Sequence, residues 1–133
     1  MTDWPKTHRH LLEAPGIAVL STVGRGGHPQ VTAVGYFLDD DGQLKLSLNT
    51  TRHKTKNLIA DPKATLFFVD PASVYRTLEV RAEVELLPDE EFAFAAKAGG
   101  HYGTDFRVHD RPGETRVIAV FHPVKVNALD MTG

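Results

Sequence analysis

The sequence contains no cysteine among its 133 residues. That absence excludes thiol nucleophiles, disulfide bonds, cysteine-ligated zinc and iron–sulfur clusters. Long apolar runs are also missing, because the longest, such as 92–96 and 117–121, are far shorter than the roughly 20 residues that span a bilayer. Residues 1–15 hold no apolar segment of the secretory kind, so we expect a cytoplasmic protein without a membrane partner.

Neither sign of charge dominates the chain, and aromatic residues are few. Fifteen Lys and Arg stand against 17 Asp and Glu, for a net charge of −2, and aromatic residues make up 8%. A nucleic-acid binder needs a basic surface and stacking platforms, so we expect no nucleic-acid partner. The excess of basic residues lies in residues 1–60, where an anion site is therefore expected.

Apolar and polar residues alternate along several segments, which predicts half-buried β-strands. Turn sequences rich in Gly, Asp and Pro separate these segments, as between antiparallel strands. The final predicted strands are separated by a break at His122-Pro123. The predicted strands cover residues 17–23, 30–38, 44–49, 63–70, 74–86, 116–121 and 124–129.

Three short helices are predicted between the strands. One lies before Pro15, one covers about 52–60 with Thr50 and Thr51 as its cap, and one runs from about Pro88 to Gly99. In the last helix Phe92, Ala95 and Ala96 are expected to point inward, with an irregular loop following over 100–112. Strands in near-continuous succession without βαβ alternation predict a mainly β (α+β) chain, an antiparallel barrel with short peripheral helices. We expect one domain over residues 1–133.

The segment 47–57 carries the strongest chemical signal. Hydroxyl and amide side chains at a strand end precede a helix start that bears Arg52, Lys54 and Lys56. Free backbone N–H groups and the helix dipole favour an anion there, and the basic side chains add charge-assisted hydrogen bonds. A phosphate is the expected ligand. The alternative is a solvated basic helix face with an ordinary cap.

Other chemical motifs are missing. The Gly24–Gly27 cluster lacks the spacing of a nucleotide-binding loop and is expected to be a hairpin turn. The seven histidines form no HExxH pattern or closely spaced ligand set, so no metal site is expected. No serine lies in a GxSxG elbow, which excludes that type of hydrolytic triad.

Four short motifs, in their order and spacing, resemble the pyridoxamine 5′-phosphate oxidase-like superfamily. They are Gly16-Ile17-Ala18-Val19-Leu20-Ser21-Thr22, His28-Pro29-Gln30-Val31, Arg52-His53-Lys54-Thr55-Lys56-Asn57-Leu58 and Asp61-Pro62-Lys63-Ala64. The similarity covers roughly residues 11 to 129 and is greatest to the branch of small reductases that use the deazaflavin coenzyme F420. It implies a six- or seven-stranded split β-barrel, the FMN-binding split barrel. It also implies a homodimer with two cofactor sites at the subunit interface.

The same resemblance implies which residues bind the cofactor. Those implied to hold its phosphate are Ser47, Asn49, Thr50, Arg52, Lys54, Lys56 and Asn57. Gln30, Val31 and Thr32 are implied to run along the flavin-type ring, and Gly35 leaves room for a close approach.

Two departures from the family pattern decide between its members. Thr32 stands where the true oxidases carry a phosphate-binding arginine, and their C-terminal Trp- and Arg-containing substrate motif is absent. Vitamin B6 oxidation is therefore not expected, and the missing arginine weighs against FMN. The resemblance then implies hydride transfer from reduced F420 to an electron-poor small molecule, such as an enone, a quinone or a tetrapyrrole.

Two other functions stay open at the level of sequence. One is an FMN-dependent oxidase or reductase of the same fold, and the other is a non-catalytic flavin-binding protein. If the protein is a reductase, a proton must reach the product. Water, Tyr36 and His101 are the candidate donors.

Overall fold

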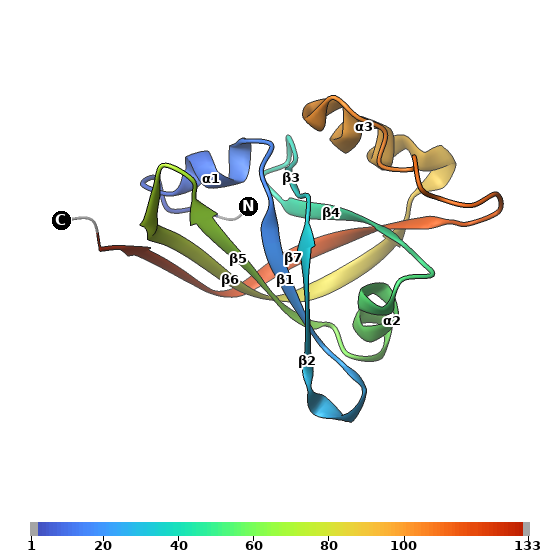
Figure 1. Cartoon of the computed structure of the whole chain (residues 1–133), viewed down its shortest axis with the longest axis horizontal. Helices are drawn as coiled ribbons and strands as arrows, with labels where there is room; N and C mark the ends of the chain where they lie inside the picture. Colours follow the sequence, from blue (N-terminus) through green and yellow to red (C-terminus); the bar gives the residue numbers. More distant parts are fainter. Residues whose placement is uncertain (1–2, 132–133) are drawn as a thin grey trace.

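The computed structural model describes residues 3–131 and shows one strongly curved antiparallel sheet (Figure 1). Its strand order is β2-β1-β5-β6-β7-β4-β3. The strands are β1 (Ala18–Val23), β2 (Pro29–Val34), β3 (Phe37–Leu38), β4 (Leu44–Asn49), β5 (Lys63–Asp70), β6 (Ser73–Pro88) and β7 (Arg116–Asp130). The predicted split β-barrel is confirmed, with seven strands.

Short helices lie around the sheet rather than inside it (Figure 1). They are α1 (Arg9–Glu13), α2 (His53–Ala60) and α3 (Ala93–Tyr102), with single 3-10 turns at Arg25–Gly27 and Glu90–Phe92. The core fills the inside of the curve, where Leu20, Leu44, Leu66, Leu78 and Val80 are fully buried. Each comes from a strand whose side chains alternate between the two faces of the sheet, as the sequence predicted.

The predicted strand 30–38 is in fact two strands. β2 pairs with β1, whereas β3 pairs with β4 at the other end of the strand order. Gly35 and Tyr36 therefore carry the chain across the split of the barrel, from one edge of the sheet to the other. The alternation of apolar and polar residues continues through Gly35 and Tyr36, so the sequence pattern did not reveal the change of partner strand.

The predicted cap of α2 is wrong. Arg52 occupies the N-cap position, and none of the described side chains caps this helix. Thr50 Oγ1 instead donates to the Thr115 carbonyl, while the amide and hydroxyl of Thr51 donate to Asn49 Oδ1. Both threonines are used to shape the strand end before the helix begins.

The predicted end of α3 is also wrong. The helix continues to Tyr102, and its left-handed C-cap residue is Gly103, with φ 70°. Gly99 is a packing position, because a Cβ there would lie 2.5 Å from the Thr104 carbonyl oxygen. The inward residues are Phe94, Ala95, Ala98 and Gly99, whereas the expected Phe92 is half-buried and Ala96 is exposed.

The C-terminal strand is not broken at His122-Pro123. β7 runs through both residues, and its register with β6 shifts so that Arg81 faces Lys125 while Ala82 faces Pro123. Val124 is the extra residue of this irregularity, and such a bulge accommodates a proline, which lacks an N–H donor. On β6 the expected buried face holds from Leu78 to Val84, but Val74 is 69% exposed.

Candidate functional site

The split of the barrel contains a cavity of about 200 Å³. It lies between the end of β2 and the end of β4, where β2 is the edge of the sheet. The lining residues are Ala33, Val34, Gly35, Ser47, Leu48, Lys54, Phe106 and Arg116. An edge strand offers unpaired backbone N–H and C=O groups, so this position can supply main-chain hydrogen bonds to a ligand.

Lys54 is the unusual residue of this cavity. It is half-buried, and among residues 3–131 its ammonium group makes no hydrogen bond or ion pair. Burial lowers the pKa of its ammonium group, and the positive charges of Arg52 and Arg116 lower it further. An anion that binds beside such a half-buried cation supplies the missing counter-charge, so its binding is favourable.

Arg116 was not predicted from the sequence, yet it lines the same cavity. Its Nε and Nη2 donate to the Asp110 carboxylate at 2.8 and 2.9 Å, and Nη2 also donates to the Phe106 carbonyl at 2.6 Å. Nη1 lies 3.2 Å from Ser47 Oγ, which places the guanidinium across the end of β4. Arg116 and Ser47 are 69 positions apart, so only the pairing of β4 with β7 brings them together.

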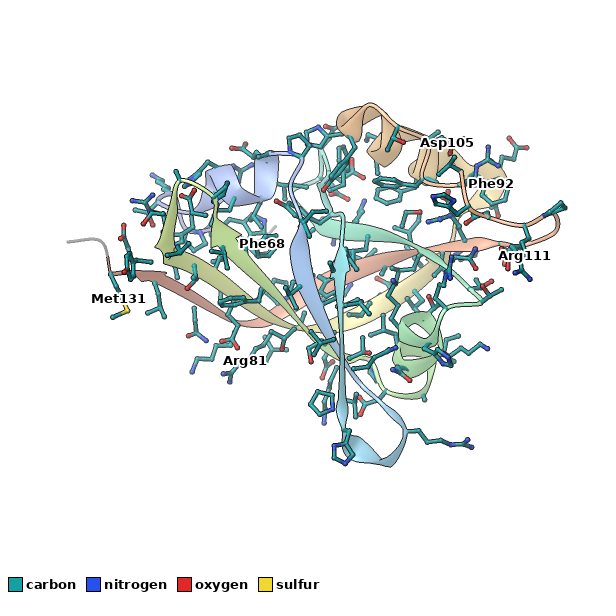
Figure 2. The ribbon with its side chains drawn as sticks, in the orientation of Figure 1. Phe68, Arg81, Phe92, Asp105, Arg111 and Met131 are labelled. Atoms are coloured by element: carbon teal, nitrogen blue, oxygen red, sulfur yellow. The ribbon has the colours of Figure 1, made fainter. Side chains whose placement is uncertain are left out.

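The loop between α3 and β7 covers this end of the sheet. Figure 2 shows Asp105 and Arg111 on this loop, close to Phe92 at the start of the helix. Phe106 from the loop and Tyr102 from the helix both pack on Gly35, where a Cβ would lie 3.6 and 3.4 Å from their rings. The loop therefore forms one wall of the cavity.

Asn49 and Thr50 are engaged in holding this loop. The Asn49 amide donates to Asp110 at 3.0 Å and to Glu114 at 3.3 Å, and Asn49 itself is 3% exposed. Thr50 Oγ1 contacts Thr115. Neither side chain lines the cavity, so their direct contact with a cofactor stays a prediction.

Gln30 and Asn57 form a second polar cluster with Thr22. Asn57 Nδ2 donates to Gln30 Oε1 at 2.8 Å and to Thr22 Oγ1 at 3.1 Å. These bonds fasten α2 to the β1–β2 hairpin. The cluster fixes the position of the helix that carries Lys54.

The remaining predicted cofactor residues lie on different sides of the molecule. Val31 is 59% exposed on the outer face of the sheet, whereas Thr32 shares the inner face with Leu20. Thr32 Oγ1 is buried and has no hydrogen-bond partner in the described part of the chain. Arg52 and Lys56 are exposed and do not line the cavity. Of the predicted phosphate residues, the cavity brings together Ser47 and Lys54.

The two candidate proton donors lie outside the cavity lining. Tyr36 is 4% exposed, and its hydroxyl donates to the Leu11 carbonyl at 2.6 Å. Burial raises its pKa to about 12, with Tyr102 adding to the effect. His101 is exposed and its Nε2 lies 3.0 Å from the Glu13 carbonyl oxygen. A catalytic role for either residue stays a prediction.

The residues present fit the anionic part of a phosphate-bearing cofactor. Among the described residues Lys54 lacks a counter-charge, and Ser47 contributes a hydroxyl, whereas the unpartnered hydroxyl of Thr32 lies on the inner face of the sheet and not in the cavity lining. A cavity of about 200 Å³ is below the usual size of pockets for complete cofactors, so only this part fits inside. Within residues 3–131, no group of three acidic or histidine side chains could hold a metal ion, and no helix could cross a membrane.

Comparison with known proteins identifies the family. The family model for pyridoxamine 5′-phosphate oxidase matches residues 4–130. Among solved structures, an F420 reductase is 34% identical, with a TM-score of 0.81 over 93% of this chain and 98% of its own. No curated protein matches the chain.

Two more distant structures share the fold. A conserved hypothetical protein from Mycobacterium tuberculosis is 18% identical, with a TM-score of 0.76 over 96% of this chain and 86% of its own. A heme binding protein from Mycobacterium smegmatis is also 18% identical, with a TM-score of 0.75 over 99% of this chain and 57% of its own. With its family match over almost its full length, the chain belongs to the pyridoxamine 5′-phosphate oxidase family, as the sequence motifs indicated.

Proposed function

We propose that the protein is an oxidoreductase that uses reduced coenzyme F420 to reduce an electron-poor small molecule. The observation that carries this proposal is Lys54, a half-buried cation beside the split of the barrel with no counter-charge among the described residues. The likeness to an F420 reductase at 34% identity supports F420 as the cofactor. Bound F420 supplies the hydride.

The chain's own residues bind the cofactor and position it. Lys54 and Ser47 hold the cofactor phosphate in the cavity, and the free edge of β2 at Gln30, Val31 and Thr32 lies along the ring. The Asn57–Gln30 hydrogen bond holds α2 against β2, so that the phosphate-binding and ring-binding residues keep their relative positions. Phe106 lines the phosphate end with an apolar ring. Such a site needs alignment of donor and acceptor atoms rather than a nucleophile, which agrees with the absence of cysteine.

A second copy of the chain completes the site in this proposal. The outer face of β2, β1 and β5 exposes a continuous set of apolar side chains, in which Val19 pairs with both Ala33 and Phe67. Val19, Val31, Phe67 and Val69 are each more than a third exposed. Contiguous apolar surface of this kind marks an interaction site. The family resemblance favours a homodimer, with the ring of the cofactor between the subunits.

The deciding experiment is titration of the purified protein with oxidised F420 and, separately, with FMN, followed by fluorescence. Binding of F420, and reoxidation of reduced F420 by a panel of enones, quinones and tetrapyrroles, is the expected result. A yellow preparation that releases stoichiometric FMN would establish the FMN-dependent alternative instead. Tight binding without turnover across the panel would indicate a flavin-binding protein, and failure to bind either cofactor would reject the proposal.

A further inference from the structure

Asp110 and Arg116 form an ion pair beside the cavity. Two hydrogen bonds of 2.8 and 2.9 Å join the carboxylate to the guanidinium. Both side chains are about one-tenth exposed, so solvent screens the pair only weakly. Arg116 lines the cavity beside Lys54, yet its charge is offset by Asp110.

The remaining charges near the cavity are few. Lys54 is half-buried and has no counter-charge among the described residues, whereas Arg52, and Arg107 near Asp110, are exposed to solvent. Glu114, on the same loop as Asp110, accepts from the Arg111 amide and from Asn49 and makes no contact with Arg116. Within residues 3–131, Lys54 is therefore the poorly solvated cation that remains for a ligand.

That charge balance distinguishes two kinds of phosphate. A phosphodiester carries one negative charge, whereas a phosphomonoester carries about −1.5 to −2 at pH 7. F420 contains a phosphodiester and FMN a phosphomonoester. A doubly charged group beside Lys54 would also lie near the Asp110 carboxylate, and the other unpaired cation close to Lys54 among the described residues, Arg52, is exposed and screened by solvent.

We propose that Asp110 is a specificity-determining residue, which by neutralising Arg116 makes the cavity select a singly charged phosphodiester over a doubly charged phosphomonoester. This inference rests on the proposed cofactor-binding function and adds the residue that decides between the two cofactor classes. Removing the Asp110 charge leaves Arg116 in place as a second free cation. The preference then moves toward the phosphomonoester.

The test compares two ligands that share one ring system. FMN is the phosphomonoester, and riboflavin 4′,5′-cyclic phosphate is the matching singly charged diester. Both are titrated at pH 8 into the wild-type protein and into Asp110→Asn, and the ratio of the two dissociation constants is measured. We expect the wild-type protein to prefer the diester and Asp110→Asn to shift the ratio toward FMN by about tenfold.

Glu114→Gln is the matched control, because it removes the same charge from the same loop without freeing Arg116. Its ratio should stay within about twofold of the wild-type ratio. An unchanged ratio in folded Asp110→Asn, or an equal shift in Glu114→Gln, overturns the inference while F420 binding remains intact. Should the wild-type protein bind F420 but neither flavin, a gain of FMN binding in Asp110→Asn supports the inference and no gain overturns it.

A second pair of variants keeps the test decisive if Asp110→Asn does not fold. Arg116→Gln leaves the Asp110 charge without its partner, so it should weaken both ligands and FMN more strongly. Adding Asp110→Asn to Arg116→Gln restores the original charge balance and should return the ratio to the wild-type value. A ratio of dissociation constants that stays the same in both variants overturns the inference. If the wild-type protein binds neither flavin nor F420, the proposed function fails and this inference fails with it.

Discussion

The hydroxyl of Tyr102 accepts a hydrogen bond from the main-chain N–H of Tyr36, with the two atoms 2.9 Å apart. The same hydroxyl lies 2.8 Å from the Gly16 carbonyl oxygen and 2.9 Å from that of Tyr36. One side chain from α3 thus joins the residues at which the chain crosses from β2 to β3 and enters β1. Because Gly35 borders the cavity, this contact also fixes the geometry of the candidate site.

Tyr102→Phe should destabilise the protein by about 1–2 kcal/mol, because it leaves the Tyr36 N–H without its acceptor. Urea denaturation followed by circular dichroism measures this change. Tyr75→Phe is the control, since Tyr75 is 63% exposed, and it should leave the denaturation midpoint unchanged. Equal midpoints for Tyr102→Phe and the wild-type protein would show that this hydrogen bond does not stabilise the crossing.

Lys54→Ala should weaken F420 binding by about 1.5–3 kcal/mol if the ammonium group makes a charge-assisted hydrogen bond to the phosphate. Fluorescence titration at low salt provides the dissociation constants. Lys125→Ala removes a charge of the same sign from an exposed position of β7 and should bind F420 like the wild-type protein. Equal affinity for Lys54→Ala and Lys125→Ala would show that Lys54 belongs to a solvated helix face and does not bind the cofactor.

The sequence predicted the strands well because alternation is a local property. Leu44, Leu46 and Leu48 alternate with polar residues and are all buried. This pattern can be recognised from a few neighbouring residues in the sequence. The break at Gly35 was missed, since alternation does not reveal which strand will be the partner. Pro123 was wrongly taken as a strand end, because the bulge that accommodates it depends on β6.

The candidate site was predicted only in its local part. Ser47 and Lys54 are close in sequence and follow one another from strand to helix, so their meeting at one cavity could be expected. Arg116 could not be found in the same way, because its approach to Ser47 depends on the pairing of β4 with β7. The engagement of Asn49 with Asp110 is equally a consequence of tertiary structure.

The Asp39 carboxylate should make the protein less stable in acid. Burial alone would raise its pKa, but hydrogen bonds from Lys45, Lys97 and the Asp40 amide lower it to about 2. A carboxyl whose pKa is depressed on folding contributes stability that is present above its unfolded pKa of about 4 and is lost as the pH falls toward 2. The loss should amount to about 1–2 kcal/mol.

Denaturation midpoints measured between pH 5 and pH 2 check this prediction. Asp39→Asn should flatten the pH dependence across that window, because its side chain cannot be protonated. Asp40→Asn is the control, since that carboxylate is 92% exposed and contacts only Lys97 among the described side chains. A pH dependence as steep in Asp39→Asn as in the wild-type protein would assign the acid sensitivity to other carboxylates.

Phe67→Glu should prevent the proposed homodimer from forming. Phe67 is 38% exposed on the outer face of β5 and pairs with Val19, so a carboxylate there would be buried against apolar side chains of the second copy. Light scattering after size-exclusion chromatography should give a dimer for the wild-type protein and a monomer for this variant. Val74→Glu introduces the same charge on β6 at a position that is 69% exposed and should remain dimeric. F420 binding separates assembly from the site, because a site completed by the partner loses affinity in the Phe67→Glu monomer. A monomer that binds F420 as tightly as the dimer would show that one copy holds the whole site.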